Sequence, residues 1–121
     1  MAAEIFSSLY QYAIDLHLYH FQTKSYAGHK ASDMHLTRVR ANTDTLLEVY
    51  QGIFGRLKVD EPYHLEVNNF SKTENIAKST LRLNKYLNQL KTDLEGYSDL
   101  ENLLDTIIGD NNQLLYLLTF N

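Results

Sequence analysis

The sequence predicts an all-α protein that folds as a four-helix bundle, with a long crossover between the second and third helices. Three observations lead to this prediction. Apolar residues recur at helical spacing in four separate segments. Helix-breaking residues are scarce, with one Pro and five Gly among 121 residues. The long stretch without helical spacing lies between the second and third segments. At this length we expect a single domain, residues 1–121.

Composition narrows the class of protein. The chain has no Cys, which excludes disulfides and thiolate metal sites. No apolar run approaches the ~20 residues that span a bilayer, and the start MAAEIFSS lacks the features of a signal peptide. A net charge of −4 argues against a surface dedicated to nucleic acid. We therefore expect no membrane contact and a cytoplasmic or virion-associated location.

The first helix is predicted from about Glu4 to Thr23. Its expected buried face consists of Phe6, Leu9, Ala13, Leu16 and His20, flanked by Tyr10, Ile14, His17 and Phe21. His20 therefore falls on the expected buried face rather than on the wet side. Two interpretations stay open for it, a core histidine that is hydrogen-bonded to a neighbour and a metal ligand.

The second helix is predicted from Tyr26 to Gly55, with Ser25 as its N-cap. Its expected core residues are Ala27, Ala31, Met34, Val39, Leu46, Val49, Tyr50, Ile53 and Phe54. His35 lies about 240° around the helix from His29 and is expected at the surface.

Potential metal ligands form a stripe along this second helix. At about 100° per residue, with His29 at 0°, Asp33 falls at about 40°, Asp44 at about 60° and Glu48 at about 100°. Imidazole and carboxylate groups suit iron, zinc or manganese. An ordinary solvated face is the alternative interpretation. Leu36 and Leu47 border the same sector, and a mixed apolar and polar face favours a contact between subunits.

The second half of the chain predicts two more helices after a non-helical connection. Residues 56–70 contain the only Pro and, fully extended, span up to ~46 Å, enough to cross the length of a bundle. The third helix is expected to begin after Ser71 and to stop at Gly96, and the fourth to begin at Ser98. Residues 109–112, Gly-Asp-Asn-Asn, are expected to kink or interrupt the fourth helix.

The spacing of the stripe predicts how a metal site forms. Asp33 and Asp44 are eleven residues apart, which is roughly 16 Å along a helix, whereas metal–ligand bonds measure only about 2.0–2.3 Å. The two pairs therefore cannot bind one ion within a chain. They can do so when two copies of the helix lie antiparallel across a two-fold axis near Arg38 and Val39. We accordingly predict a homodimer through the second helix.

The end of the first helix and the ligand stripe of the second resemble the ferroxidase segment of Dps proteins, the mini-ferritins that protect DNA from starvation and oxidative stress. That family has a His followed by an aromatic residue at the end of its first helix, as in His20-Phe21. Its second helix has a His and an Asp four residues apart, matched by His29 and Asp33, and then an Asp and a Glu, matched by Asp44 and Glu48. The resemblance covers about the first half of the chain. More narrowly, the chain is similar to compact Dps-like proteins of phages and large DNA viruses.

The resemblance implies a ferritin-like bundle with an intersubunit iron site. His20, His29 and Asp33 would come from one subunit, and Asp44 and Glu48 from its partner. The site would oxidise Fe(II) with peroxide or oxygen, for iron sequestration or protection from oxidative stress. A dimer and a dodecamer both fit the sequence, and zinc or manganese suits the same ligands. The alternative function is a structural or assembly protein, virion-associated, that keeps the bundle and the dimer around a non-catalytic metal site.

Overall fold

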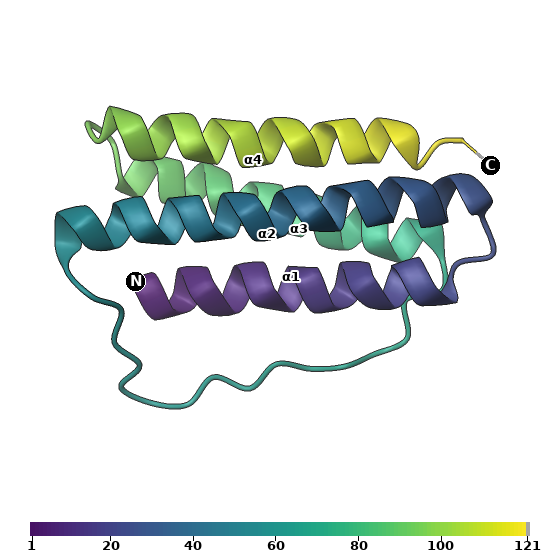
Figure 1. The fold of residues 1–121 in the computed structure, drawn as a ribbon, viewed down its shortest axis with the longest axis horizontal. Coiled ribbons are helices and arrows are strands. Elements are labelled where there is room, and N and C mark those ends of the chain that lie inside the picture. Colours follow the sequence, from purple (N-terminus) through teal and green to yellow (C-terminus); the bar gives the residue numbers. More distant parts are fainter. Residues whose placement is uncertain (121) are drawn as a thin grey trace.

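The computed structural model describes residues 1–120, which form four α-helices and no strands. The helices are α1 (Ala2–Gln22), α2 (Tyr26–Phe54), α3 (Thr73–Asp93) and α4 (Ser98–Leu117). They lie side by side as a bundle (Figure 1). The predicted all-α class and the four helices are confirmed. None of the helices in this part of the chain is both long and apolar enough to cross a membrane.

The helices form a ring in the order α1–α2–α4–α3. The contacts between helices are those of α1 with α2, α2 with α4, α4 with α3, and α3 with α1. Leucines fill the centre, and Leu9, Leu46, Leu87 and Leu104, one from each helix, are all at most 1 % exposed. Burial of such side chains from four helices is the main stabilising contribution in a bundle of this kind.

Residues 55–72 connect α2 to α3 without helix or strand. Figure 1 shows this connection leaving one end of the bundle and running beside α1 to the other end. Three glutamine side chains bond its backbone, namely Gln51 with Leu57, Gln11 with Glu66, and Gln22 with Phe70. The Gln11 amide makes two bonds, accepting from the Glu66 N–H at 2.8 Å and donating to the Glu66 carbonyl at 2.9 Å. These contacts satisfy backbone groups that no secondary structure pairs.

The buried face of α1 differs from the predicted one. Its buried residues are Ile5, Leu9, Tyr12, Asp15, Leu16 and Tyr19. Phe6 and Tyr10 are each 37 % exposed, and Phe21 is 71 % exposed. The prediction is confirmed for Leu9 and Leu16 and wrong for Phe6, because α1 presents the rings of Tyr12 and Tyr19 to the core instead. On α2, the expected core residues Met34, Ile53 and Phe54 are also exposed.

His35 is buried, contrary to the prediction of a surface position. It is 3 % exposed, and its Nε2 lies 2.9 Å from Asn111 Oδ1 on α4. The Asn111 amide in turn donates to Asn84 Oδ1 on α3 at 2.8 Å, which leaves its oxygen as the acceptor for His35 Nε2–H. Burial lowers the pKa of His35 to about 4. Because Asn111 is fully buried in this network, α4 continues unbroken through residues 109–112, where a break was expected.

The turn between α1 and α2 brings the two helices into close contact. Ser25 caps α2, as predicted, by accepting from the N–H of Gly28 at 3.0 Å. Gly28 is buried against Tyr19 of α1, whose hydroxyl lies 2.8 Å from Thr73 Oγ1. A side chain at Gly28 would collide with the Tyr19 hydroxyl. The missing side chain therefore permits the approach of α1 and α2 at this end.

We expect Gly28→Ala to lower the free energy of unfolding by about 1–3 kcal/mol, because the added methyl displaces a fully buried tyrosine. Urea denaturation followed by circular dichroism measures it. Gly52→Ala is the matched control, since it lies in the same helix with open space around it, and it should be neutral or stabilise by about 1 kcal/mol. Equal stability of the two variants would contradict the role given to Gly28.

Candidate metal centre

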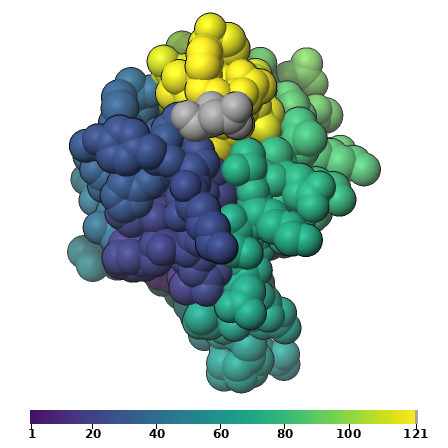
Figure 2. Space-filling model, turned by 90° about the vertical axis from the view of Figure 1, so that its right-hand side faces the viewer, coloured from purple at the N-terminus to yellow at the C-terminus, as the bar shows by residue number. Residues whose placement is uncertain are grey.

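The α1–α2 turn places two of the predicted ligands together. His20 belongs to the last turn of α1 and His29 to the first turn of α2. Their rings stack with centroids 4.0 Å apart and planes inclined by 19°. Figure 2 looks at this end of the bundle, where the dark-blue residues of the turn lie at the surface and the connection projects below. The two histidines are half-buried, so both are accessible at their edges.

Each histidine is held by the backbone of the other. His20 Nδ1 lies 3.1 Å from the His29 carbonyl, and His29 Nδ1 lies 2.9 Å from the His20 carbonyl. A carbonyl only accepts, so Nδ1 carries the proton in both rings. The lone pair of a neutral imidazole is then on Nε2, which has no hydrogen-bond partner among residues 1–120. Metal-bound histidines commonly show this arrangement, with one nitrogen on a carbonyl and the other on the metal.

The stacking geometry limits how two such imidazoles share an ion. An ion bound by two imidazoles lies close to both ring planes, about 2.0–2.1 Å from each nitrogen. Two planes inclined by 19° do not meet that close to rings stacked at 4.0 Å. Binding of one ion by both rings would therefore require one of them to rotate. If neither ring rotated, an ion on either Nε2 would need all its other ligands from other residues.

Two aromatic residues complete the surroundings of the pair. The His17 ring stacks on Phe21 with centroids 4.7 Å apart and lies 6.0 Å from the His20 ring. Phe21 also contacts the edge of the His20 ring at 5.4 Å. The His20 ring is therefore bordered by an exposed ring rather than enclosed in the core.

The three predicted carboxylates lie on the outer side of α2. Asp33, Asp44 and Glu48 are exposed, and their side chains make no hydrogen bond or ion pair within residues 1–120. Arg40 lies in the same sector and is exposed as well. Within the described chain no three His, Asp or Glu side chains come together around a space for an ion. One chain thus presents two separate groups, one around His29 and Asp33 and the other at Asp44 and Glu48.

The interpretation of Leu36 and Leu47 as part of an outer apolar face is wrong. They are 7 % and 8 % exposed, respectively. Both side chains belong to the hydrophobic core of the bundle. The apolar surface beside the carboxylates comes instead from α1, where the Phe6 and Tyr10 rings stack with centroids 4.3 Å apart and remain partly exposed. The sequence predicts Phe6 on the buried face of the first helix and Tyr10 on its flank, so it does not predict this exposed pair.

Comparison with known proteins gives one family. The model of a family described as a family of unknown function, DUF5856, matches residues 20–118. This range begins at His20, includes all five predicted ligands and extends to the end of α4. No curated protein and no solved structure matches the chain.

Proposed function

This chain belongs to the DUF5856 family, whose function is unknown, and we propose that it binds Fe(II) at a site shared by two copies of the chain and oxidises it there. The observation that carries the proposal is the pair of histidines. Both are fixed in the tautomer that leaves Nε2 free for a metal. Asp33, one helical turn after His29, is exposed and unpaired within residues 1–120.

The second half of the site is Asp44 and Glu48 of another copy. With the two α2 helices antiparallel, the axis passes near Arg38 and Val39, and each His29–Asp33 pair meets the carboxylates of the other copy. The absence of ion pairs at these two carboxylates within residues 1–120 favours this arrangement, because an incoming metal ion displaces no lysine or arginine side chain. Each dimer then holds two equivalent sites.

The exposed aromatic pair of α1 supports this dimer. Tyr10 borders the same small cavity as Val39 and Arg40, which puts it next to the proposed axis. Phe6 stacks on Tyr10, so the pair forms an apolar surface at the centre of the contact. Partly exposed aromatic residues of this kind are enriched in interfaces between proteins.

The chemistry follows from the ligands. Imidazole and carboxylate groups bind Fe(II), and the carboxylates hold the Fe(III) product. With peroxide as oxidant, two Fe(II) ions give one electron each, and the peroxide takes up two protons and leaves as two waters. The resemblance to Dps proteins supports this reaction, and the crossing connection supports a bundle of the ferritin-like type. His20 joins His29 on the ion when its ring rotates.

The test is anaerobic Fe(II) binding by the purified full chain, followed by addition of peroxide or air. We expect saturable binding of about one or two ions for each site and oxidation faster than in protein-free buffer. Light scattering should give a mass of two chains or a multiple of two. A protein that binds no Fe(II) while forming the dimer would favour the structural role instead. A monomer that binds iron would refute the shared site.

A further inference from the structure

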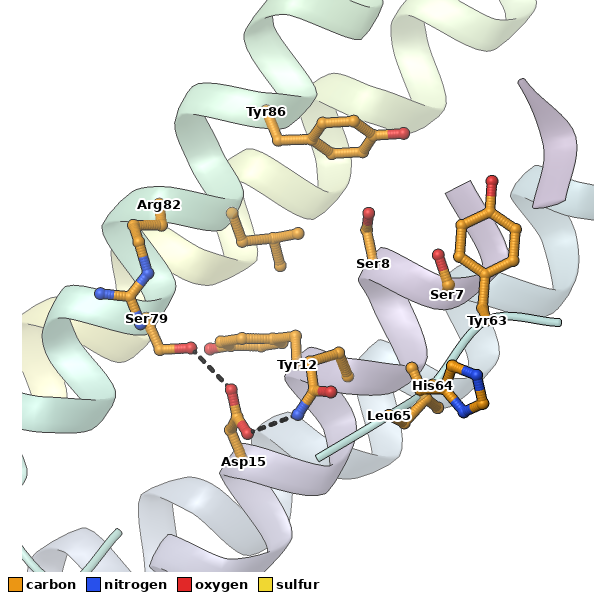
Figure 3. Close-up of a pocket in the computed structure, with 12 residues that line it drawn as sticks. Ser7, Ser8, Tyr12, Asp15, Tyr63, His64, Leu65, Ser79, Arg82 and Tyr86 are labelled. Atoms are coloured by element: carbon orange, nitrogen blue, oxygen red, sulfur yellow. Dashed lines mark hydrogen bonds between the residues drawn. The ribbon is translucent and has the colours of Figure 1, made fainter. Parts of the chain in front are cut away.

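A cavity lies between α1, α3 and the connection, and none of the residues that line it belongs to α2. Its volume is about 420 Å³, within the range of small-molecule sites. Figure 3 shows Tyr12 and Asp15 from α1, Tyr63 from the connection, and Arg82 and Tyr86 from α3 around it. The iron-binding proposal makes no use of these residues, so this site is independent of it.

A carboxylate without a cation partner lies in this cavity. Asp15 is only 7 % exposed. Its two oxygens accept from neutral groups, the Gln11 amide at 2.9 Å and the Ser79 hydroxyl at 3.2 Å. Asp15 makes no ion pair within the described chain, and burial raises the pKa of its carboxyl. A carboxylate held out of water in this way gains free energy from a cation that reaches it.

Aromatic rings surround the space next to this carboxylate. Tyr12, Tyr63 and Tyr86 line the same cavity (Figure 3). The faces of tyrosine rings attract cations, and the rings also bury the apolar part of a ligand. Arg82 is the single lysine or arginine among the lining residues and is exposed. A ligand that reaches Asp15 therefore meets its carboxylate and the tyrosine rings, together with the positive charge of Arg82, which also acts on Asp15.

We propose that this cavity binds a small organic molecule with a primary ammonium group. The ammonium donates to the Asp15 carboxylate, and the carbon skeleton contacts the tyrosine rings. Arg82 favours ligands whose other end is neutral or anionic. Gln11 is a positioning residue. Its amide bonds both Asp15 and the Glu66 backbone, and it thereby holds the carboxylate of α1 and the connection in a fixed relative position.

Two probes with the same ring and opposite charges test the proposal, phenethylamine and 3-phenylpropionate. We expect saturable binding of phenethylamine by the full chain below about 10 mM at neutral pH, measured by NMR titration with a chelator present. We expect no saturable binding of 3-phenylpropionate. Asp15→Asn should weaken amine binding at least about tenfold, because it replaces the charged carboxylate by a neutral amide of nearly the same shape.

Asp93→Asn is the matched control, as it removes an exposed carboxylate from α3 and should leave amine binding unchanged. Tyr63→Ala is the second variant, since Tyr63 is exposed on the connection and its removal leaves the core intact. It should weaken amine binding severalfold even if Asp15→Asn fails to fold. The proposal is overturned by absence of saturable amine binding, by equal binding of the anion, or by amine binding that neither variant at the cavity weakens. Because the assay contains no iron, failure here is distinct from failure of the iron site.

Discussion

Replacing Asp44 and Glu48 together by Ala is expected to reduce iron oxidation to the level of protein-free buffer. The two carboxylates form one half of each proposed site, and the remaining His29 and Asp33 leave an ion with too few protein ligands to be held. Both side chains are exposed and make no contact within residues 1–120 that the fold requires. The variant should therefore keep the thermal stability of the wild type while losing activity. Absorbance of the Fe(III) product after addition of Fe(II) measures the loss.

The matched control is Asp60→Ala/Glu61→Ala. It removes the same two charges from the exposed connection, away from α2. Net charge and any general attraction of cations change equally in both double variants. Iron oxidation at the wild-type rate in this control would assign the loss to the positions of Asp44 and Glu48. An equal loss in both variants would show that only the overall charge matters.

A mixture of two inactive variants tests whether the site is shared. His29→Ala/Asp33→Ala lacks the other half of the site, so it should also be inactive. When the two double variants are refolded together, half of the dimers are mixed, and each mixed dimer has one intact site of two. Activity should therefore return to about a quarter of the wild-type level. No recovery in proven mixed dimers would falsify the antiparallel arrangement.

Acidification is expected to destabilise the protein through His35. Burial keeps this imidazole neutral and outweighs the opposing effect of the Asn111 contact, so the pKa is about 4 in the folded chain against 6.5 for the free group. The unfolded chain therefore takes up the proton first as the pH falls below 6.5. Stability should decrease between about pH 6.5 and pH 4, by about 3 kcal/mol in total from this residue, and the effect should level off below that range. Urea denaturation at a series of pH values measures it.

His35→Gln is the control for the acid effect. The glutamine amide donates to Asn111 but does not titrate in this range. The variant is expected to be less stable at neutral pH, because it fills the core less well, yet to have a flatter pH dependence. Other titrating groups contribute equally to both proteins, so the difference between the two curves isolates His35. Parallel curves would show that His35 does not control the acid response.

Helical spacing alone predicts most of this fold. The ends of α2, its cap at Ser25 and the non-helical connection follow from local chemistry that acts over a few residues. Two of the predicted ligands, His20 and His29, are brought together by a three-residue turn. They are nine positions apart in sequence, and the close approach of α1 and α2 at this end involves Gly28, whose packing against Tyr19 is a tertiary property.

Burial of polar groups is less predictable from sequence. Asp15, His35 and Asn111 all lie in the interior because partners on other helices bond them. A sequence read one helix at a time does not show those partners, so polar residues are assigned to the surface or to a break. The same reason explains α1, where Tyr12 and Tyr19 are core residues because threonines of α3 bond their hydroxyls.

The connection also divides the chain into two helical hairpins, α1–α2 and α3–α4. Each hairpin closes through a short turn of a few residues and so forms from contacts that are local in sequence. The eighteen residues 55–72 act as a tether that keeps the two hairpins at an effective concentration in the millimolar range. Association of the hairpins is then a docking step, and small changes in tether length should alter its free energy only slightly, because loop-closure entropy grows slowly with length. If two copies exchanged hairpins across this tether, the resulting dimer would leave the outer face of α2 uncovered.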